Sequence, residues 1–424
     1  MIQRYLGNKT SFIDEIIKEI DKLCNKEDYV CDIFSGTLSV SMKLKEKGYK
    51  VISNDINRFS YCFGKSHLLN NTIPIIDLKK LGINFNEYEN EALNRLNEIN
   101  TNDEGFKFLK KQKYRIPYIN LIILLKYLDN LDSTKLPSSY NNTYFFDYYT
   151  EKGSHSKFIS QRGSEGRRKF FTPDNGSRID LYLNKIREWF NNKLLNDDLY
   201  FLLLSIISES IEKISNTQGT FHDFPREQYD SRALKELKLR LPKFDNILSK
   251  TEGHILGKER DSLDFIKEVP RHKVLYIDPP YNFRQYTSYY FMLNLICDYC
   301  EIKDLEKYFN NVKFVRGQNM EKNFISSFCK NSEFISSLKK LIKDADTEWI
   351  IMSYFNGRNH KTSNNDKKCI LTDLENFFKS ELFEKDSLII KPIERKNYQS
   401  YGGHKATKVD ELLYIVKKDK NEMV

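Results

Sequence analysis

The sequence of 424 residues has few of the features of a secreted or membrane-inserted protein. Its seven cysteines are odd in number and widely spaced, so they predict no disulfide framework. Cys297 and Cys300 form a Cys-x-x-Cys pair, but no second pair completes a zinc site, and their apolar surroundings favour packing within a helix. The pattern predicts a protein of a reducing compartment with no metal ion.

Long apolar runs are also missing. The first residues lack the apolar core of a signal peptide. The most apolar stretches, residues 116–125 and 199–207, are shorter than the roughly 20 residues that a membrane span needs. We therefore expect a cytoplasmic protein with no membrane partner.

Neither sign of charge dominates the chain. Lys and Arg number 68 against 59 Asp and Glu, which gives a net charge of +9. Together with 26 Tyr and 29 Phe, this weak basic excess favours a polyanionic partner, because phosphates bind Lys and Arg and bases stack on aromatic rings. An ordinary solvated surface explains the same numbers, so charge alone does not identify the partner.

The first part of the chain has the pattern of a βαβ unit. An apolar strand over residues 29–34 ends at a small-residue turn, 35–37, and a helical pattern follows and ends near Gly48. A second strand pattern covers residues 50–55. Such a unit crosses over right-handed between parallel strands.

The same α/β character returns late in the chain. Further strands are predicted over residues 273–278, 349–353 and 411–416. Between them lies a polar region with a loop-like, basic run over residues 151–178. We predict an α/β protein with a Rossmann-like sheet and an inserted, mostly helical and loop domain. The expected boundaries are 1–80 and 196–424 for the sheet domain and 81–195 for the insertion.

Asp55 lies at the end of the second strand, 23 residues after Asp32. An acidic residue at this place can accept both hydroxyls of a nucleoside ribose. The strict Gly-x-Gly-x-x-Gly loop is missing, which argues against NAD or FAD and favours a ligand without a pyrophosphate. A purely structural turn is the alternative explanation.

The tetrapeptide Asp278-Pro279-Pro280-Tyr281 is the most specific signal, and it follows an apolar strand. The prolines fix φ, so the Asp278 carboxylate and the Pro279 carbonyl are held as two rigid acceptors beside an aromatic ring. These groups suit a planar heterocycle with an exocyclic amino group, which stacks on Tyr281 while the acceptors take its hydrogens. A proline-rich turn that ends a strand is the alternative.

Five blocks resemble, in chain order, those of the DNA adenine methylase family, which uses S-adenosylmethionine to methylate the exocyclic nitrogen of adenine. They are residues 5–9, 32–37, 54–56, 261–262 and 278–281. Asn216-Thr217-Gln218-Gly219-Thr220-Phe221 is similar to a further block of the family. The order of the blocks is that of the family's alpha group.

The resemblance implies roles for individual residues. The residues that it implies for the cofactor are Tyr5, Gly7, Asn8, Lys9, Asp32, Phe34, Ser35, Gly36, Thr37, Asp55, Ile56, Asp261 and Asp278. The implied catalytic residues are Asp278, Pro279, Pro280 and Tyr281. DNA contacts are expected from three loops. Those of the basic run 151–178 are Lys157, Arg162, Arg167, Arg168 and Lys169, with a flexible solvated loop as the alternative. The others are Arg284, Gln285 and Tyr286 after the tetrapeptide, where a solvated loop is the alternative, and Tyr398 and Lys405 before the last strand, where a hairpin turn is the alternative.

The resemblance also implies a mechanism and partners. The target adenine is expected to flip out of duplex DNA into the site. We expect a DNA-associated monomer, with a cognate restriction endonuclease as a candidate partner and a solitary methylase as the alternative. The amino group of cytosine, adenine in RNA, and a non-catalytic DNA-binding relative are the competing interpretations.

Overall fold

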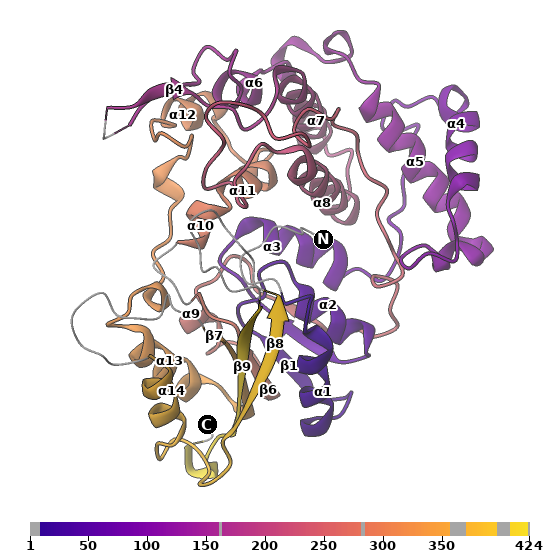
Figure 1. Ribbon diagram of the computed structural model, residues 1–424. Helices are drawn as coiled ribbons and strands as arrows, with labels where there is room; N and C mark the ends of the chain where they lie inside the picture. Colours follow the sequence, from indigo (N-terminus) through magenta and orange to yellow (C-terminus); the bar gives the residue numbers. More distant parts are fainter. Residues whose placement is uncertain (1–8, 161–162, 281–284, 357–369, 397–407, 423–424) are drawn as a thin grey trace. The chain divides into compact units, whose positions relative to one another are not determined.

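The structure is a computed structural model that describes residues 9–160, 163–280, 285–356, 370–396 and 408–422 (Figure 1). The chain forms two compact units. The sheet unit is made of Tyr5–Gly64, Lys250–Ser288 and Phe324–Val424. The helical unit is made chiefly of Lys65–Ser249 and Tyr289–Asn323. The helical unit therefore extends beyond the insertion expected at 81–195.

A seven-stranded sheet with the order β5-β2-β1-β6-β7-β9-β8 organises the sheet unit. The pairs among β5, β2, β1, β6 and β7 are parallel, and β9 runs antiparallel to β7 and β8. The strands are β1 (Tyr29–Asp32), β2 (Lys50–Ser53), β5 (Ile255–Leu256), β6 (His272–Ile277), β7 (Thr347–Asn356), β8 (Ile389–Lys396) and β9 (Lys408–Lys417). This mostly parallel sheet confirms the predicted α/β fold and each of the five strands expected from the sequence.

Helices cover both faces of this sheet (Figure 1). On one face, α13 (Phe334–Asp344) and α14 (Ile370–Phe378) pack on alternate strand residues such as Cys31, Leu275 and Ile277. The opposite face receives α1 (Ile13–Leu23) and α2 (Ser39–Glu46). Because side chains alternate across a strand, Asp32, Tyr276 and Asp278 belong to this second face.

Short helices complete the sheet unit near the ends of the strands. They are α3 (Arg58–Phe63), α9 (Ser262–Phe265) and the 3₁₀ turn Ser327–Cys329. The helix α10 (Tyr286–Tyr289) follows the tetrapeptide 278–281 in the chain, and the chain passes from this unit into the helical one at its end.

The helical unit is built around buried aromatic side chains. Its helices are α4 (Phe85–Glu98), α5 (Arg115–Asp129), α6 (Tyr144–Tyr149), α7 (Pro173–Asn191), α8 (Asp197–Ile214), α11 (Phe291–Asp298) and α12 (Leu305–Asn310). Tyr149, Trp189 and Phe309 are almost fully buried within it.

The expected loop over 151–178 contains an antiparallel pair of strands, β3 (Lys157–Ile159) and β4 (Glu165–Arg167). Its last residues already belong to α7, which Thr172 caps. The glycines and charges of this run concealed the short strands.

The described residues contain neither a candidate membrane span nor a candidate metal site. None of the described helices is both long and apolar enough to cross a membrane. Within the same residues, no group of three or more His, Cys, Asp and Glu is placed to hold a metal ion. Cys297 and Cys300 are free and buried.

Arg168 corrects one expectation about DNA contacts. Only 2% of this residue is exposed. Its guanidinium donates to the carbonyls of Val315 and His155 at 3.0 Å, and to those of Phe314 at 3.0 Å and Tyr148 at 3.3 Å. Arg168 therefore joins β4 to the segment before residue 317, and this burial argues against a phosphate contact.

Arg168→Ala should destabilise the helical unit by about 2–3 kcal/mol, because four buried carbonyls lose a charged donor. Lys157→Ala is the control in the same hairpin, since its side chain is exposed and it should change stability by less than about 0.5 kcal/mol. Denaturant unfolding of both variants measures the difference. Equal stability of the two variants would contradict the structural role of Arg168.

Candidate functional site

The predicted motifs of the sheet unit meet at one edge of the sheet. β1 ends at Asp32, β2 ends at Ser53 and β6 ends at Ile277, and these strands are parallel neighbours. Open α/β sheets bind ligands at the carboxyl ends of their strands. The residues that follow these three strands therefore share one location.

A pocket opens at this edge, and all of its lining residues belong to the sheet unit. It brings together six residues expected at the cofactor or catalytic site, namely Phe34, Asp55, Ile56, Asp261, Asp278 and Pro280. The sequence analysis missed other lining residues, which are Ile33, Asn54, Arg260, Ser262, Thr287, Phe324, Ser326 and Cys329. We call this cavity the edge pocket.

Asp55 is held firmly at the pocket wall. Its Oδ1 accepts from the backbone and side-chain nitrogens of Asn57, both at 2.9 Å, and its Oδ2 accepts from the Gly36 nitrogen at 2.9 Å. Burial raises the pKa of the carboxyl group, and these hydrogen bonds oppose the rise. The carboxylate therefore fixes the turn and has a defined orientation toward a ligand.

The turn after β1 depends on glycine. Gly36 has φ +50° and Leu38 has φ +60°, so the backbone is left-handed on both sides of Thr37. The Ser35 nitrogen donates to the Asn54 carbonyl at 2.9 Å, which ties this turn to the end of β2. Phe34 presents its ring to the pocket, edge-on to Phe328 at 5.0 Å between centroids.

Asp32 has a different place from the one expected. Its Oδ2 accepts from the Ser41 hydroxyl at 2.6 Å and the Ser41 nitrogen at 3.2 Å, and it does not line the edge pocket. Burial raises its pKa to about 7. Asp32 thus anchors α2 beneath the turn, and its direct contact with a cofactor stays a prediction, as do those of Ser35, Gly36 and Thr37.

Asp261 also lines the pocket, where it caps α9. Its Oδ1 accepts from the Leu263 nitrogen at 2.9 Å. The neighbouring Arg260 directs its guanidinium to Glu268, with contacts of 2.6 and 3.0 Å. The cation of the pocket is thus already paired, while Asp55, Asp261 and Asp278 supply acceptors.

The hydrogen-bond acceptors of the pocket fit S-adenosylmethionine. Three carboxylates favour a ligand that carries hydroxyl and amino hydrogens and positive charge. A ribose, an adenine amino group, an ammonium and a sulfonium satisfy this description. The aromatic and apolar side chains of Phe34 and Ile56 supply the surface that a purine ring needs.

Lys9 pairs with Asp278 inside the sheet unit. Lys9 Nζ lies 2.9 Å from Asp278 Oδ1 and 2.7 Å from Glu411 Oε1. Burial raises the pKa of Asp278 to about 6, and the Lys9 ammonium opposes this rise. Lys9 was expected to touch the cofactor, but it does not line the edge pocket and instead pairs with the Asp278 carboxylate.

Gln285 and Tyr286 line the edge pocket, although the sequence placed them in a DNA-facing loop. Gln285 Oε1 accepts from the Ser326 nitrogen at 3.0 Å, and Thr287 Oγ1 accepts from the Phe324 nitrogen at 3.1 Å. Residues 324–329 therefore form a second wall of the pocket. No local pattern predicts this wall, because its hydrogen bonds join residues about forty positions apart.

Several expected site residues lie outside the part of the chain that the structure describes. They are Tyr5, Gly7, Asn8, Arg162, Tyr281, Arg284, Tyr398 and Lys405. Their roles stay predictions. Pro279 is described but does not line the edge pocket.

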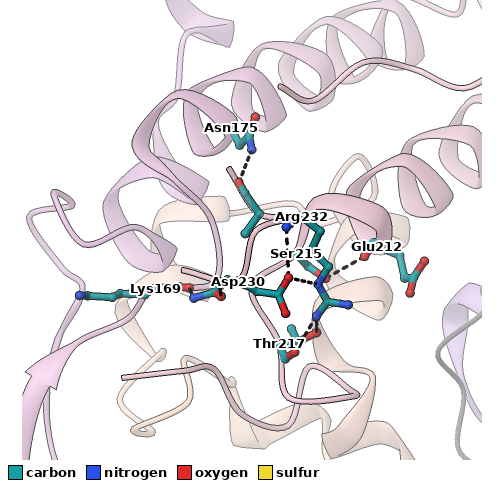
Figure 2. A network of polar contacts seen from close by, with 9 residues as sticks. Lys169, Asn175, Glu212, Ser215, Thr217, Asp230 and Arg232 are labelled. Carbon is teal, nitrogen blue, oxygen red and sulfur yellow. Dashed lines mark hydrogen bonds and ion pairs between the residues drawn. The ribbon is translucent and has the colours of Figure 1, made fainter. Parts of the chain in front are cut away.

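In the helical unit, the Asn216 block organises polar contacts next to the basic run. Asn216 Nδ2 donates to the Lys169 carbonyl at 2.7 Å, and its Oδ1 accepts from the Asp230 nitrogen at 2.9 Å. Figure 2 shows Arg232 reaching toward both Asp230 and Thr217, whose carbonyl it contacts at 2.6 Å. The block thus fixes the backbone at Lys169 after the β3–β4 hairpin.

Comparisons with known proteins identify the family to which the chain belongs. The model of the D12 class N6 adenine-specific DNA methyltransferase family matches residues 5–348. The chain is 28% identical over 425 residues to the Type II methyltransferase M.FokI of Planomicrobium okeanokoites, covering 98% of this chain and 53% of that protein. It is 26% identical over 421 residues to the modification methylase StsI of Streptococcus sanguinis, covering 98% and 52%.

A third relative has nearly the same length. The chain is 25% identical over 417 residues to the Type II methyltransferase M.NlaIII of Neisseria lactamica, covering 98% of this chain and 99% of that protein. The chain thus spans about half the length of M.FokI and StsI and almost all of M.NlaIII.

Asp55→Ala should weaken binding of S-adenosylmethionine by about 1–3 kcal/mol, because a charged hydrogen-bond partner is removed. Asp264→Ala on the exposed side of α9 is the control and should bind normally. Isothermal titration calorimetry measures both affinities. If Asp55→Ala bound as tightly as the wild type, the edge pocket would not be the nucleoside site.

Proposed function

We propose that this chain, which belongs to the D12 class N6 adenine-specific DNA methyltransferases, transfers the methyl group of S-adenosylmethionine to the exocyclic amino group of adenine in duplex DNA. One observation carries the proposal. Asp278 and Pro280, at the carboxyl end of β6, line the same pocket as the nucleoside-type acid Asp55. The acceptor for an amino group and the binding groups for a nucleoside are therefore adjacent.

In this proposal the edge pocket holds the cofactor. Asp55 accepts from the ribose hydroxyls, and Asp261 and Ile56 flank the adenine ring. Gln285 and Ser326 close the far wall through their hydrogen bond. When bound, S-adenosylmethionine supplies an electrophilic methyl group on a sulfonium.

Asp278 and Pro279 act on the target amino group. The Asp278 carboxylate and the Pro279 carbonyl each accept one amino hydrogen, which concentrates the lone pair on the nitrogen and sets its direction. Tyr281 stacks on the base. The amino group becomes a much stronger acid once it carries the extra methyl, so no strong base is required, and no metal ion takes part.

An amino group inside a base-paired duplex cannot reach this pocket. We propose that the target adenine flips out of the helix to reach Asp278. The exposed Lys157 and Arg167 and the partly exposed Lys169 of the helical unit are proposed as phosphate contacts, and target recognition is assigned to the insertion. Arg168 is left out of this set because of its burial.

The names of the relatives support a biological setting. StsI is named a modification methylase, and M.FokI and M.NlaIII are named Type II methyltransferases. We propose that this chain likewise modifies DNA as a cytoplasmic monomer within a restriction-modification system. Its partner there is a cognate restriction endonuclease.

Asp278→Ala should lower methyl transfer about 1,000-fold or more, because the acceptor that orients the amino group is lost. Cofactor affinity should stay within about 1 kcal/mol of the wild type, because the remaining groups of the pocket are intact. Transfer of labelled methyl to mixed duplex DNA, with calorimetry of cofactor binding, separates the two effects. An active Asp278→Ala variant would refute the catalytic assignment.

The rate of methyl transfer should fall as the pH drops through about 6. Burial raises the pKa of Asp278 to about 6, and protonation below that pH replaces the charged acceptor of the amino hydrogen by a neutral carboxyl group, which accepts more weakly. Lys9→Met removes the cation that opposes this rise, so the acidic limb of the pH profile should move to higher pH. Single-turnover rates measured from about pH 5 to about pH 9 give the pH profile of methyl transfer, because this range covers the titration of a perturbed carboxyl group. A limb that stays in place in Lys9→Met would show that another group controls it.

A further inference from the structure

Glu411 on β9 is a fully buried acid that the proposed mechanism does not use. We infer that Glu411 is a positioning residue, which holds the Lys9 ammonium against the Asp278 carboxylate and so fixes the acceptor for the target amino group. The inference rests on the proposed function, because it assigns a role within the same reaction.

The first support is the geometry around Lys9. Its Nζ lies 2.7 Å from Glu411 Oε1 and 2.9 Å from Asp278 Oδ1. The side chains of Lys9 and Glu411 are 4% and 0% exposed, and that of Asp278 is 16% exposed toward the pocket. The ammonium therefore bridges the fully buried Glu411 carboxylate and the Asp278 carboxylate, which lines the edge pocket.

The second support is that Glu411 is itself fixed. Its Oε1 also accepts from the Ser353 hydroxyl at 2.8 Å, and its Oε2 accepts from Arg395 Nε at 2.9 Å. Ser353 lies on β7 and Arg395 on β8, the two strands that flank β9. Both oxygens are thus oriented by neighbouring strands, so the direction of the bond to Lys9 is set by the sheet.

Strand register explains why these groups converge. Tyr414 and Val416 of β9 pack with α13 and α14, so Glu411 and Leu413 belong to the opposite face of the sheet. Asp278 and Asp32 belong to that same face. A shift of β9 by one residue would turn Glu411 toward the apolar core.

Charge balance gives the third support. Asp278, Lys9, Glu411 and Arg395 form a chain of alternating charge. Burial alone would lower the pKa of Lys9, but Asp278 and Glu411 raise it above its usual range. Burial would raise the pKa of Glu411, and Lys9 and Arg395 bring it below its usual value. Each buried charge is thus stabilised by its neighbours, and an unpaired one would be costly.

Without Glu411, the four-carbon stem of Lys9 would have one anchor in place of two. Lysine has a flexible stem and a point charge, so a single contact leaves it several rotamers. The Asp278 carboxylate would then lose a fixed partner on the side away from the substrate. Tyr276 and Asp32 lie near Asp278 on this face and carry no positive charge. Lys391 on the same face already pairs with Glu15 and Glu19, so it does not replace the ammonium.

The test is a double-mutant cycle on the rate of methyl transfer. Glu411→Gln alone should lower kcat about 10- to 30-fold while the KM values for cofactor and DNA change less than about threefold. In a Lys9→Met background, the same substitution should change kcat less than about twofold, because the residue through which Glu411 acts is already gone. Equal fold losses of kcat in the two backgrounds would overturn the inference.

Glu394→Gln is the matched control. Glu394 lies on β8 and pairs with Lys408 of β9 at 2.6 Å, but both side chains are more than half exposed. This variant makes the same change from Glu to Gln in another ion pair that joins β8 and β9. Its kcat should equal that of the wild type, and a loss as large as that of Glu411→Gln would point to a general effect of the sheet and overturn the inference.

Folding of Glu411→Gln must be established separately, because it alters a buried ion pair. If that variant does not fold, Ser353→Ala decides, since it removes the 2.8 Å hydrogen bond to Glu411 and keeps every charge. Ser353→Ala should lower kcat about threefold in the wild-type background and should not change the kcat of the Lys9→Met variant. A wild type that does not methylate adenine would refute the proposed function itself, whereas an active wild type with additive variants would refute only the role of Glu411.

Discussion

The burial of the Asp278 carboxylate at the end of a parallel strand is the constraint on which the site depends. A carboxylate in this place is costly unless a cation lies beside it, and Lys9 provides that cation at 2.9 Å. Lys9 is buried as well and needs its own balance, which Glu411 and then Arg395 supply. The ion pairs therefore link a residue near the start of the chain, the end of β6 and the antiparallel strands β8 and β9.

The mostly parallel sheet provides the remaining geometry. Because β1, β2 and β6 run in the same direction, their carboxyl ends deliver the Gly36 turn, Asp55 and Asp278 to one edge. Helix α9 and the segment 324–329 then close the pocket around that edge. The chemistry needs only rigid acceptors and an aromatic surface, and both come from residues that immediately follow strands.

Much of this could be predicted from local sequence. Apolar runs predicted β1, β2, β6, β7 and β9. Spacing indicated Asp55, the motif after β6 indicated Asp278, and the family resemblance added Asp261. The edge strand β8 was missed because Pro392 and four charged residues interrupt its apolar pattern, as is common at sheet edges. The roles of Glu411 and of the wall at Ser326 depend on contacts with residues distant in sequence, which no local pattern encodes. Arg168 looked like a phosphate contact for the same reason, since a basic run does not show which member is buried.

The most direct test of the account is the identity of the methylated product. The protein is incubated with methyl-labelled S-adenosylmethionine and mixed duplex DNA, the DNA is digested to nucleosides, and the labelled nucleoside is identified by mass spectrometry. The account predicts deoxyadenosine methylated on its exocyclic nitrogen. Label on deoxycytidine, label on RNA alone, or bound cofactor without any transfer would contradict it.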